Sequence, residues 1–419
     1  MSLKKNQIFE TTIENLSSDG SGVAHVEGQA VFVPGAAPGD VIRCRIVKAL
    51  KSYAFGRIDA ILAPGPGRVA PDCAVCTPCG GCGLRHLSYA TECEAKTGFV
   101  RDAFARLGGF DVSSFEFSPV LALTDHTAHY RNKVQLPVGL DADGHVVTGF
   151  YAGRTHRIVP CPDCRLQPGV LNEIGNALCA FFAEKGIQPY SEETGRGLVR
   201  HIFLRRGAHS GQIMVCLVCT RAKLPSAEEL CTRLKAQFAE ITTILLNVNA
   251  KNTNVILGTE THTLYGQGYI EDTLCGVPVQ LGPLSFYQVN TLAAEQLYGI
   301  AAQYAQLTPD DLLLDLYCGM GTIGLSMAAH CRELIGVEIV PEAIESAKAN
   351  AARMGADVAA KSRFFCADAG QAATRLAAEG LHPDIVMLDP PRKGCDEATL
   401  SAVVRMSPRR VVYVSCNPA

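Results

Sequence analysis

The chain has 419 residues, of which 47% are apolar and 19% are charged, and its formal net charge is −3. This length predicts two or three domains, and the composition fits a soluble globular protein. The small net charge excludes a global field that attracts nucleic acid, and no apolar run approaches the ~18 residues of a membrane span. Because the N-terminus lacks a signal-peptide pattern, we expect a cytoplasmic protein with no membrane contact, whose 18 cysteines are mostly thiols or metal ligands.

The first part of the chain, up to residue 62, is typical of a small β-barrel. Residues that favour strands alternate or cluster there, and segments rich in Gly, Pro, Ser and Asp separate them. The predicted strands are residues 8–13, 30–33, 41–47 and 54–61. Short strands divided by such turns predict a barrel of the OB type.

Basic side chains are concentrated towards the end of this region. Only one acidic residue, Asp59, lies among them. They indicate either a phosphate-contacting face or a solvated strand edge, and the sequence weighs the two about equally. The basic residues are Arg43, Arg45, Lys48, Lys51, Arg57 and Arg68.

A linker of sequence Ala-Pro-Gly-Pro-Gly, at residues 63–67, precedes two groups of cysteines. The first group has the spacing C-x2-C-x2-C-x2-C and the second C-x2-C, a density that indicates bound metal in a cytoplasmic protein. In chain order they are Cys73, Cys76, Cys79, Cys82, Cys161 and Cys164. The spacing favours an iron–sulfur cluster with three close ligands and one remote ligand. A zinc site on the first two and last two of these thiols is the alternative, and either site leaves two thiols spare.

Beyond residue 285 short apolar runs alternate with helical stretches such as Pro341 to Met354. The runs are residues 312–316, 334–338, 363–366, 385–388 and 411–414. This βαβ rhythm predicts an α/β domain with a parallel, doubly wound sheet, whose functional groups lie at the carboxyl ends of the strands. The residues between the linker and this domain look α+β.

The first of these runs leads into a glycine-rich loop at residues 315–322. Gly319 to Gly324 match G-x-G-x-x-G, and Glu338 ends the next run, where a carboxylate can take two ribose hydroxyls. The match fits a nicotinamide site, an S-adenosylmethionine site or a tight strand-to-helix turn. Asp368 follows the third run, where it is placed either to meet an adenine edge or to cap a helix.

The fourth run ends at Asp389-Pro390-Pro391-Arg392, and the fifth leads to Cys416. A DPP turn followed by an aromatic residue would suit methylation of an exocyclic amine, and Arg392 argues against that chemistry. A lone cysteine is more often inert, but three other strand ends converge on the same edge. A thiolate together with a methyl donor indicates C5 methylation of a pyrimidine. The thiolate adds to C6, C5 becomes nucleophilic, and a base then removes the C5 proton.

Several segments carry signatures of a known family. They are Pro71-Asp-Cys73, Cys79-Gly-Gly-Cys82, Arg85-His-Leu87, Tyr130-Arg-Asn-Lys133, Asp163-Cys-Arg-Leu-Gln167, Arg200-His-Ile-Phe203, Asn252 to Gly258, Ser285-Phe-Tyr-Gln-Val-Asn290, Asp389 to Arg392 and Ser415 to Pro418. With them the chain resembles the TrmA/RumA-type RNA (uracil-5-)-methyltransferases, especially the ribosomal RNA branch, over nearly its whole length.

The resemblance implies three domains. Residues 1–66 would form an RNA-binding TRAM barrel, residues 67–284 a central α+β domain with an iron–sulfur cluster, and residues 285–419 a Rossmann-like methyltransferase domain. The implied 4Fe–4S cluster has Cys73, Cys79, Cys82 and Cys164 as ligands. Cys76 and Cys161 depart from the family pattern.

The resemblance also implies roles at the site. Cys416 would be the nucleophile, and Asp389 would face the target uracil. The S-adenosylmethionine site, with Gly319 of the glycine-rich loop, would include Gln288, Tyr317, Thr322, Glu338, Asp368 and Asp389.

We therefore expect a monomeric, S-adenosylmethionine-dependent enzyme that makes 5-methyluridine in RNA, in particular in 23S rRNA. A tRNA uridine-5 methyltransferase, an iron–sulfur nicotinamide oxidoreductase and a non-catalytic RNA-binding protein are the alternatives. In the family, a glutamate base and two further strands follow the nucleophile. On this pattern we expect a domain truncated after its fifth strand, with its base beyond Ala419, and an open strand edge.

Overall fold

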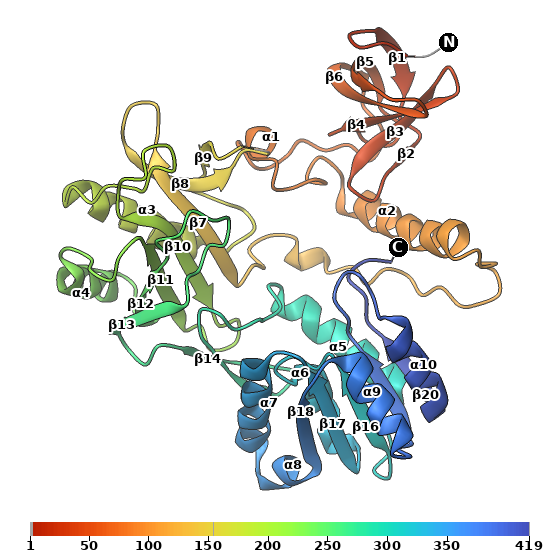
Figure 1. The fold of residues 1–419 in the computed structure, drawn as a ribbon. Coiled ribbons are helices and arrows are strands. Elements are labelled where there is room, and N and C mark those ends of the chain that lie inside the picture. Colours follow the sequence, from red (N-terminus) through yellow and green to blue (C-terminus); the bar gives the residue numbers. More distant parts are fainter. Residues whose placement is uncertain (1–2, 154, 419) are drawn as a thin grey trace. The chain divides into compact units, whose positions relative to one another are not determined.

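The computed structural model of the protein describes residues 3–153 and 155–418, which form two compact units (Figure 1). Within these residues, no helix has both the length and the apolar character that a membrane crossing requires. The first unit comprises Met1–Thr127, Phe150–Cys161 and Pro418–Ala419, and the second comprises Ala128–Gly149 and Pro162–Asn417.

The first unit begins with a barrel-like sheet. Its strands are β1 (Ile8–Thr12), β2 (Asn15–Leu16), β3 (Ser21–Val26), β4 (Gln29–Pro34), β5 (Val41–Ala49) and β6 (Tyr53–Ala63), in the order β1-β5-β6-β4-β3-β2. The four predicted strands are confirmed as β1, β4, β5 and β6. Their inward-facing Val, Ile and Ala side chains form a separate hydrophobic core.

The strand β3 was missed because glycine and serine at its start resemble a turn. Gly22 is nevertheless strand backbone, paired with Val33 of β4 and Leu16 of β2. A Cβ atom at this position would lie 2.8 Å from the Cβ of Ala36. The glycine is therefore required by close packing within the barrel rather than by a turn.

The cysteine loop, residues 73–82, follows the barrel. It contains the short helix α1 (Cys76–Cys79) and leads to α2 (Tyr89–Asp102), which begins where the Ser88 side chain caps the Thr91 amide. The loop is closed at its base by an antiparallel bridge between Arg68 and Leu87. The short helices η1 (Ala103–Leu107) and η2 (Thr124–His126) complete this part of the chain.

The second unit contains a mixed sheet covered by two helices. Its strands are β7 (Lys133–Leu140), β8 (Val146–Tyr151), β10 (Val199–Arg206), β11 (Ile213–Cys219), β12 (Ile241–Val248) and β13 (Glu260–Tyr265), in the order β13-β12-β11-β10-β7-β8. The short strand β9 (Ile158–Pro160) belongs to the first unit. The strands β10 and β11 are buried along almost their whole length, as expected for central strands that are covered on both faces. The helices of this part of the chain are α3 (Gly169–Glu184) and α4 (Ala227–Gln237).

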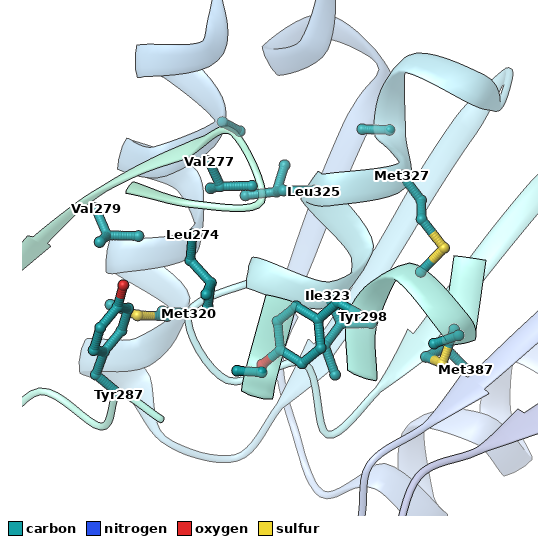
Figure 2. Close-up of a cluster of buried hydrophobic side chains, with 14 of the residues drawn as sticks. Leu274, Val277, Val279, Tyr287, Tyr298, Met320, Ile323, Leu325, Met327 and Met387 are labelled. Carbon is teal, nitrogen blue, oxygen red and sulfur yellow. The ribbon is translucent and has the colours of Figure 1, made fainter. Parts of the chain in front are cut away.

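A hairpin of β14 (Ile270–Leu274) and β15 (Val277–Leu281) leads to the C-terminal part of this unit. Its apolar side chains pack in one cluster with Tyr298 of α5 (Thr291–Ala305) and with Met387 of the parallel sheet (Figure 2). Phe203 and Met214, from the mixed sheet, belong to the same cluster. One continuous core therefore joins the mixed sheet, the hairpin and the parallel sheet.

The C-terminal sheet is parallel, as predicted. Its strands are β16 (Leu312–Leu316), β17 (Glu333–Glu338), β18 (Ser362–Cys366), β19 (Ile385–Leu388) and β20 (Arg410–Tyr413), in the order β18-β17-β16-β19-β20. The helices are α6 (Thr322–Met327), η3 (Ala328–His330), α7 (Pro341–Met354), α8 (Ala356–Lys361), α9 (Ala369–Ala378) and α10 (Glu397–Met406). This alternation is the predicted doubly wound fold, and the strand order reverses at β16.

Candidate active site at the carboxyl edge of the parallel sheet

The register of the parallel sheet brings the predicted residues to one edge. Leu316 of β16 pairs with Val337 of β17 and with Leu388 of β19, and Leu388 pairs with Tyr413 of β20. The next residues in each strand direction are therefore neighbours at the carboxyl edge. They are Tyr317, Glu338, Asp389 and, three residues beyond Tyr413, Cys416.

The glycine-rich loop is tied to Glu338. Gly319 and Gly321 have positive φ angles of 54° and 81°, which glycine adopts without steric cost. The Gly319 amide donates to Oε2 of Glu338 at 3.2 Å, and the Val340 amide donates to Oε1 at 2.9 Å. Each carboxylate oxygen keeps acceptor capacity, so Glu338 can both hold the loop and accept ligand hydroxyls.

A buried tyrosine that the sequence analysis did not identify links two predicted cofactor residues. Tyr298 of α5 is only 3% exposed, and its hydroxyl makes hydrogen bonds with Thr322 and Gln288. Burial raises the pKa of this phenol to about 12, although both hydrogen bonds act in the opposite direction. Tyr298 therefore remains a neutral hydrogen-bonding group that fixes Thr322 relative to Gln288.

The segment that carries Gln288 is held by Asn132, which lies in the signature before β7. The Asn132 side chain donates to the Gln288 carbonyl at 2.7 Å and to the Thr291 hydroxyl at 2.9 Å. Its backbone amide donates to the Val289 carbonyl at 2.9 Å. From the sequence, Asn132 is recognisable only as part of a signature, because a contact across 156 residues leaves no local pattern.

Two aspartates at this edge have raised pKa values. Burial raises the pKa of Asp389 to about 6. Burial also raises the pKa of Asp315 to about 8, against the hydrogen bond of 3.0 Å that its Oδ2 accepts from the Gly324 amide. The second oxygen of Asp315 is buried and has no partner among the described residues. The edge thus holds one aspartate that is mostly ionised at neutral pH and one that favours its protonated form.

Asp368 is the N-cap of α9, where its side chain accepts from the Gln371 amide at 3.1 Å. The capping interpretation is thus confirmed, and a contact with an adenine ring stays a prediction.

Cys416 lies on an exposed turn directly after β20. The turn is ordered by the Val414 amide, which donates to the Leu388 carbonyl at 2.8 Å, and by the Ser415 hydroxyl, which donates to the Asn417 carbonyl at 2.6 Å. The Cys416 thiol is exposed. A reagent can therefore reach it from solvent at the edge where the cofactor residues gather.

A second feature that the sequence analysis missed joins the turn after Asp389 to its neighbours. The Cys395 thiol makes hydrogen bonds with the hydroxyls of Tyr317 and Tyr413, which follow β16 and end β20. The Tyr317 hydroxyl also lies 3.4 Å from the Thr399 hydroxyl. These contacts fix the spacing between the turn that bears Asp389 and the strand that leads to Cys416.

The predicted cluster ligands are divided between the two units. Cys73, Cys79 and Cys82 are half-buried in the cysteine loop of the first unit, together with Cys76. Cys164 is buried in the second unit, where its amide and carbonyl both bond to the Asn172 side chain. Thiols in ordered segments are the type of donor that an iron–sulfur cluster or a zinc ion requires.

The cysteine loop carries its own counter-charge. Arg85 pairs with both oxygens of Asp72, through an Nη2–Oδ2 bond of 2.7 Å and a second bond from Nε. Its guanidinium also lies near the thiols of Cys82 and Cys73. A cation in this place stabilises thiolate ligands, which is the state that both iron–sulfur and zinc binding require.

Most of the basic stretch in the barrel is neutralised. Arg43 pairs with Glu10 at 2.9 Å, and both Arg45 and Arg57 pair with Asp59. Arg68 forms an ion pair of 2.6 Å with Asp40, which is fully buried. These four arginines fit the structural interpretation rather than a phosphate-contacting face. Lys48 and Lys51 are exposed and have no ion pair among the described residues.

Comparison with known proteins identifies two matching families and several similar proteins. Residues 208–419 match the family model of tRNA (uracil-5-)-methyltransferases, and residues 3–58 match the TRAM domain. An uncharacterized RNA methyltransferase of Halalkalibacterium halodurans is 40% identical over 417 residues, covering 100% of this chain and 90% of its own. One from Clostridium tetani is 39% identical over 417 residues, covering 100% and 89%.

A solved structure is also similar. It is the tRNA (uracil-54, C5)-methyltransferase of Pyrococcus abyssi in complex with S-adenosyl-L-homocysteine, with 26% identity and a TM-score of 0.75, covering 98% of this chain and 90% of that one. The family match and these relatives identify the family of the chain, and the solved structure shares its fold. The chain therefore belongs to the TrmA/RumA-type RNA uracil-5-methyltransferases, enzymes that use S-adenosylmethionine, and it carries an N-terminal TRAM domain.

Proposed function

We propose that this protein methylates carbon 5 of a uridine in RNA through covalent addition of Cys416 to C6 of the base. One observation carries the proposal: the Glu338-bound glycine loop, the half-buried Asp389 and the exposed Cys416 thiol follow neighbouring strands at the same edge. This arrangement supports a reaction that needs both a nucleotide-like cofactor and a nucleophile.

The cofactor would lie along the edge from β18 to β19. Glu338 would accept ribose hydroxyls while it keeps its bonds to the Gly319 and Val340 amides. Tyr298 would hold Gln288 and Thr322 in place at the other end. When bound, S-adenosylmethionine would supply a methyl group that a nucleophilic carbon takes from the sulfonium centre, with S-adenosyl-L-homocysteine as the leaving group. The proposed cofactor residues are Gln288, Tyr317, Gly319, Thr322, Glu338, Asp368 and Asp389.

The chain's own chemistry would begin at Cys416. Its thiolate would form a bond to C6 of uracil, and the electron pair of the C5–C6 double bond would make C5 nucleophilic. The base must leave its stack, because the thiolate approaches C6 from the face of the ring. Asp389, on the neighbouring strand, would accept the N3–H of the uracil as a carboxylate and so orient the ring. Removal of the C5 proton and elimination of Cys416 would complete the cycle.

For the substrate we propose ribosomal RNA, in particular 23S rRNA, modified by a monomeric enzyme in the cytoplasm. The support is the resemblance of the cysteine signatures to the ribosomal RNA branch. A tRNA is the second candidate, because the matching family model and the Pyrococcus abyssi structure both name tRNA. Methylation of purified unmodified 23S rRNA and of unmodified tRNA, followed by mapping of the modified nucleotide, distinguishes the two.

We also propose a 4Fe–4S cluster on Cys73, Cys79, Cys82 and Cys164, with a structural or RNA-positioning role. Methyl transfer by the route above moves no net electron, so the cluster is not needed as a redox centre. The support is the chemistry of the donors: thiols of a closed loop beside Arg85, and a buried thiol in an ordered segment. A zinc site on Cys73, Cys76, Cys161 and Cys164 remains the alternative.

The test follows tritium from C5 of uracil. RNA labelled at C5 should lose tritium to water when S-adenosylmethionine is present. RNA that contains 5-fluorouridine should form a covalent adduct with the protein, a step that needs no removal of a C5 proton. Cys416→Ser should abolish both the release and the adduct without changing cofactor affinity. Cys366→Ser is the matched control, because Cys366 is the exposed thiol that ends β18 at the same edge. Retained release in Cys416→Ser would refute the nucleophile, and preference for NAD(H) over S-adenosylmethionine would refute the reaction.

A further inference from the structure

Three cations lie together at the ends of β7 and β10, next to the segment that carries Gln288. Lys133 is directly opposite Arg205 in the antiparallel register, and Arg131, two residues before Lys133, is near enough for its positive charge to act on Lys133. Arg131 also forms an antiparallel bridge with Asn290. The bridge places the segment before β7 next to the segment that carries Gln288. The three cations are therefore close to the proposed site for the cofactor and the uridine.

The group has no acidic partner. Among the described residues, no ion pair involves Arg131, Lys133 or Arg205. Burial, together with the positive charges of Arg205 and Arg131, lowers the pKa of Lys133. Like charges that are partly withdrawn from water and face no carboxylate are costly, and a bound anion removes that cost.

The three cations are not equivalent. The Arg205 guanidinium is only 1% exposed, and it donates to the carbonyls of Gly282 at 2.8 Å and Ser285 at 2.7 Å. It therefore contributes positive charge, but burial keeps its remaining N–H groups, including the unpartnered Nε, away from a ligand that approaches from solvent. Arg131 and Lys133 are half-buried, and their side chains make no hydrogen bond in the described part of the chain.

We propose that Arg131 and Lys133, with the buried charge of Arg205 behind them, bind a backbone phosphate of the RNA next to the target uridine. A half-buried arginine and lysine with unused donors match a phosphodiester, because its single negative charge is shared by two oxygens that can each accept hydrogen bonds. This inference rests on the proposed function, and it adds to that function the place on the mixed sheet where the RNA backbone is held.

The carboxylate of S-adenosylmethionine is the other anion that the site could take, and the experiment separates the two. Binding of a fluorescein-labelled oligouridylate is measured by anisotropy across about 50 to 200 mM KCl, and binding of S-adenosylmethionine by calorimetry. The variants are Lys133→Gln and Arg131→Gln. Lys348→Gln is the matched control, because Lys348 is an exposed lysine of α7 paired with Glu345 in the same unit.

We expect each of the two variants to weaken oligouridylate binding about 5- to 10-fold and to lower the slope of log K against log salt by about 0.7, the share of one phosphate contact on a single strand. The affinity for S-adenosylmethionine should stay within about twofold of the original protein. Lys133→Arg should restore the slope, since it keeps the charge and adds donors.

Two results would overturn the inference. One is a loss of S-adenosylmethionine affinity with RNA binding unchanged, which would assign the cations to the cofactor carboxylate. The other is no change in either affinity in variants whose thermal unfolding is normal. Tritium release at saturating RNA is measured in parallel. If the original protein releases none, the uridine chemistry fails while the salt slopes still decide the phosphate site.

Discussion

The carboxyl edge of the parallel sheet and the cysteine loop gather functional residues in two different ways. At the edge, residues up to 99 positions apart, from Tyr317 to Cys416, become neighbours because parallel strands in register end together. In the cysteine loop, the proposed ligands Cys73, Cys79 and Cys82 share one segment because they are close in sequence, and the proposed fourth ligand, Cys164, belongs to the other unit. A regular fold therefore places distant residues predictably, whereas a loop site depends on long-range closure that no local pattern specifies.

The cysteine loop is nevertheless ordered by contacts that require no metal. The Val69 amide donates to the His86 carbonyl at 2.9 Å, and Arg85 bridges to Asp72 across the loop. Arg68, at the base of the loop, is fixed to the barrel through Asp40. The loop is thus partly ordered before any metal binds, which would lower the entropy lost on binding of the proposed cluster.

The largest expected effect concerns the metal. Cys79→Ser should lose the cluster, so that iron and sulfide fall from about four per chain to near zero with the visible absorption of the cluster. Cys76→Ser is the matched control on the same helix, α1, and it should keep the iron. Stoichiometric zinc without iron in the original protein would refute the cluster, and loss of metal in Cys76→Ser would change the ligand assignment.

The next effect concerns the base of the loop. Arg68→Ala should lower the free energy of unfolding by about 3 kcal/mol, because it leaves the fully buried Asp40 carboxylate without its cation. Arg57→Ala, in the same barrel, should change the unfolding midpoint little, because Arg57 is exposed and Asp59 keeps Arg45. Urea denaturation of both variants measures the difference. Equal midpoints would show that Arg68 is not a structural residue of the barrel.

At the sheet edge, Asp389→Asn should reduce the rate of tritium release roughly 10- to 100-fold, because this factor corresponds to the free energy of one lost hydrogen bond to a charged group. Burial raises the pKa of Asp389 to about 6, so the carboxylate is lost as the pH falls through about 6. The rate of the original protein should therefore decline below this pH. Asp389→Asn should lack that decline, and a rate profile unchanged by the substitution would exclude Asp389 from the reaction.

The sequence predicted best where a local pattern decides the structure. The helix expected from Pro341 to Met354 has these bounds, because a proline suits its first turn and a glycine follows its end. Cys416 and Glu338 lie at the predicted strand ends because strand ends are recognisable in the sequence, while their roles stay predictions. The roles of Tyr298, Asn132 and Cys395 could not be predicted, since each depends on a contact with a distant segment.

In the barrel, too, contacts between distant segments could not be predicted from the sequence. Its basic residues suggested a phosphate-contacting face, but the acids that neutralise them are supplied across strands. Glu10 of β1 reaches Arg43 because Glu10 and Arg43 are paired in the β1–β5 register. Strand register is set by the packing of the whole barrel, so the net charge of a face cannot be read from one stretch of sequence.

The smallest expected effect tests how the edge controls its own charge. Asp315 is 1% exposed, and burial raises its pKa to about 8. Between the ordinary pKa of an aspartate in the unfolded chain and pH 8, the folded protein therefore keeps a proton that the unfolded chain has released. The stability of the protein should therefore fall as the pH rises from about 5 to 8. One pKa unit corresponds to about 1.4 kcal/mol, and we expect a loss of about 1–3 kcal/mol over this range.

Asp315→Asn should flatten this dependence, because the amide oxygen still accepts from the Gly324 amide and carries no charge to be buried. Asp310→Asn, an exposed position five residues earlier, should keep the slope of the original protein. Thermal unfolding of the three proteins at several pH values provides the measurement. If Asp315→Asn keeps the full change of stability with pH, groups other than Asp315 control the pH dependence.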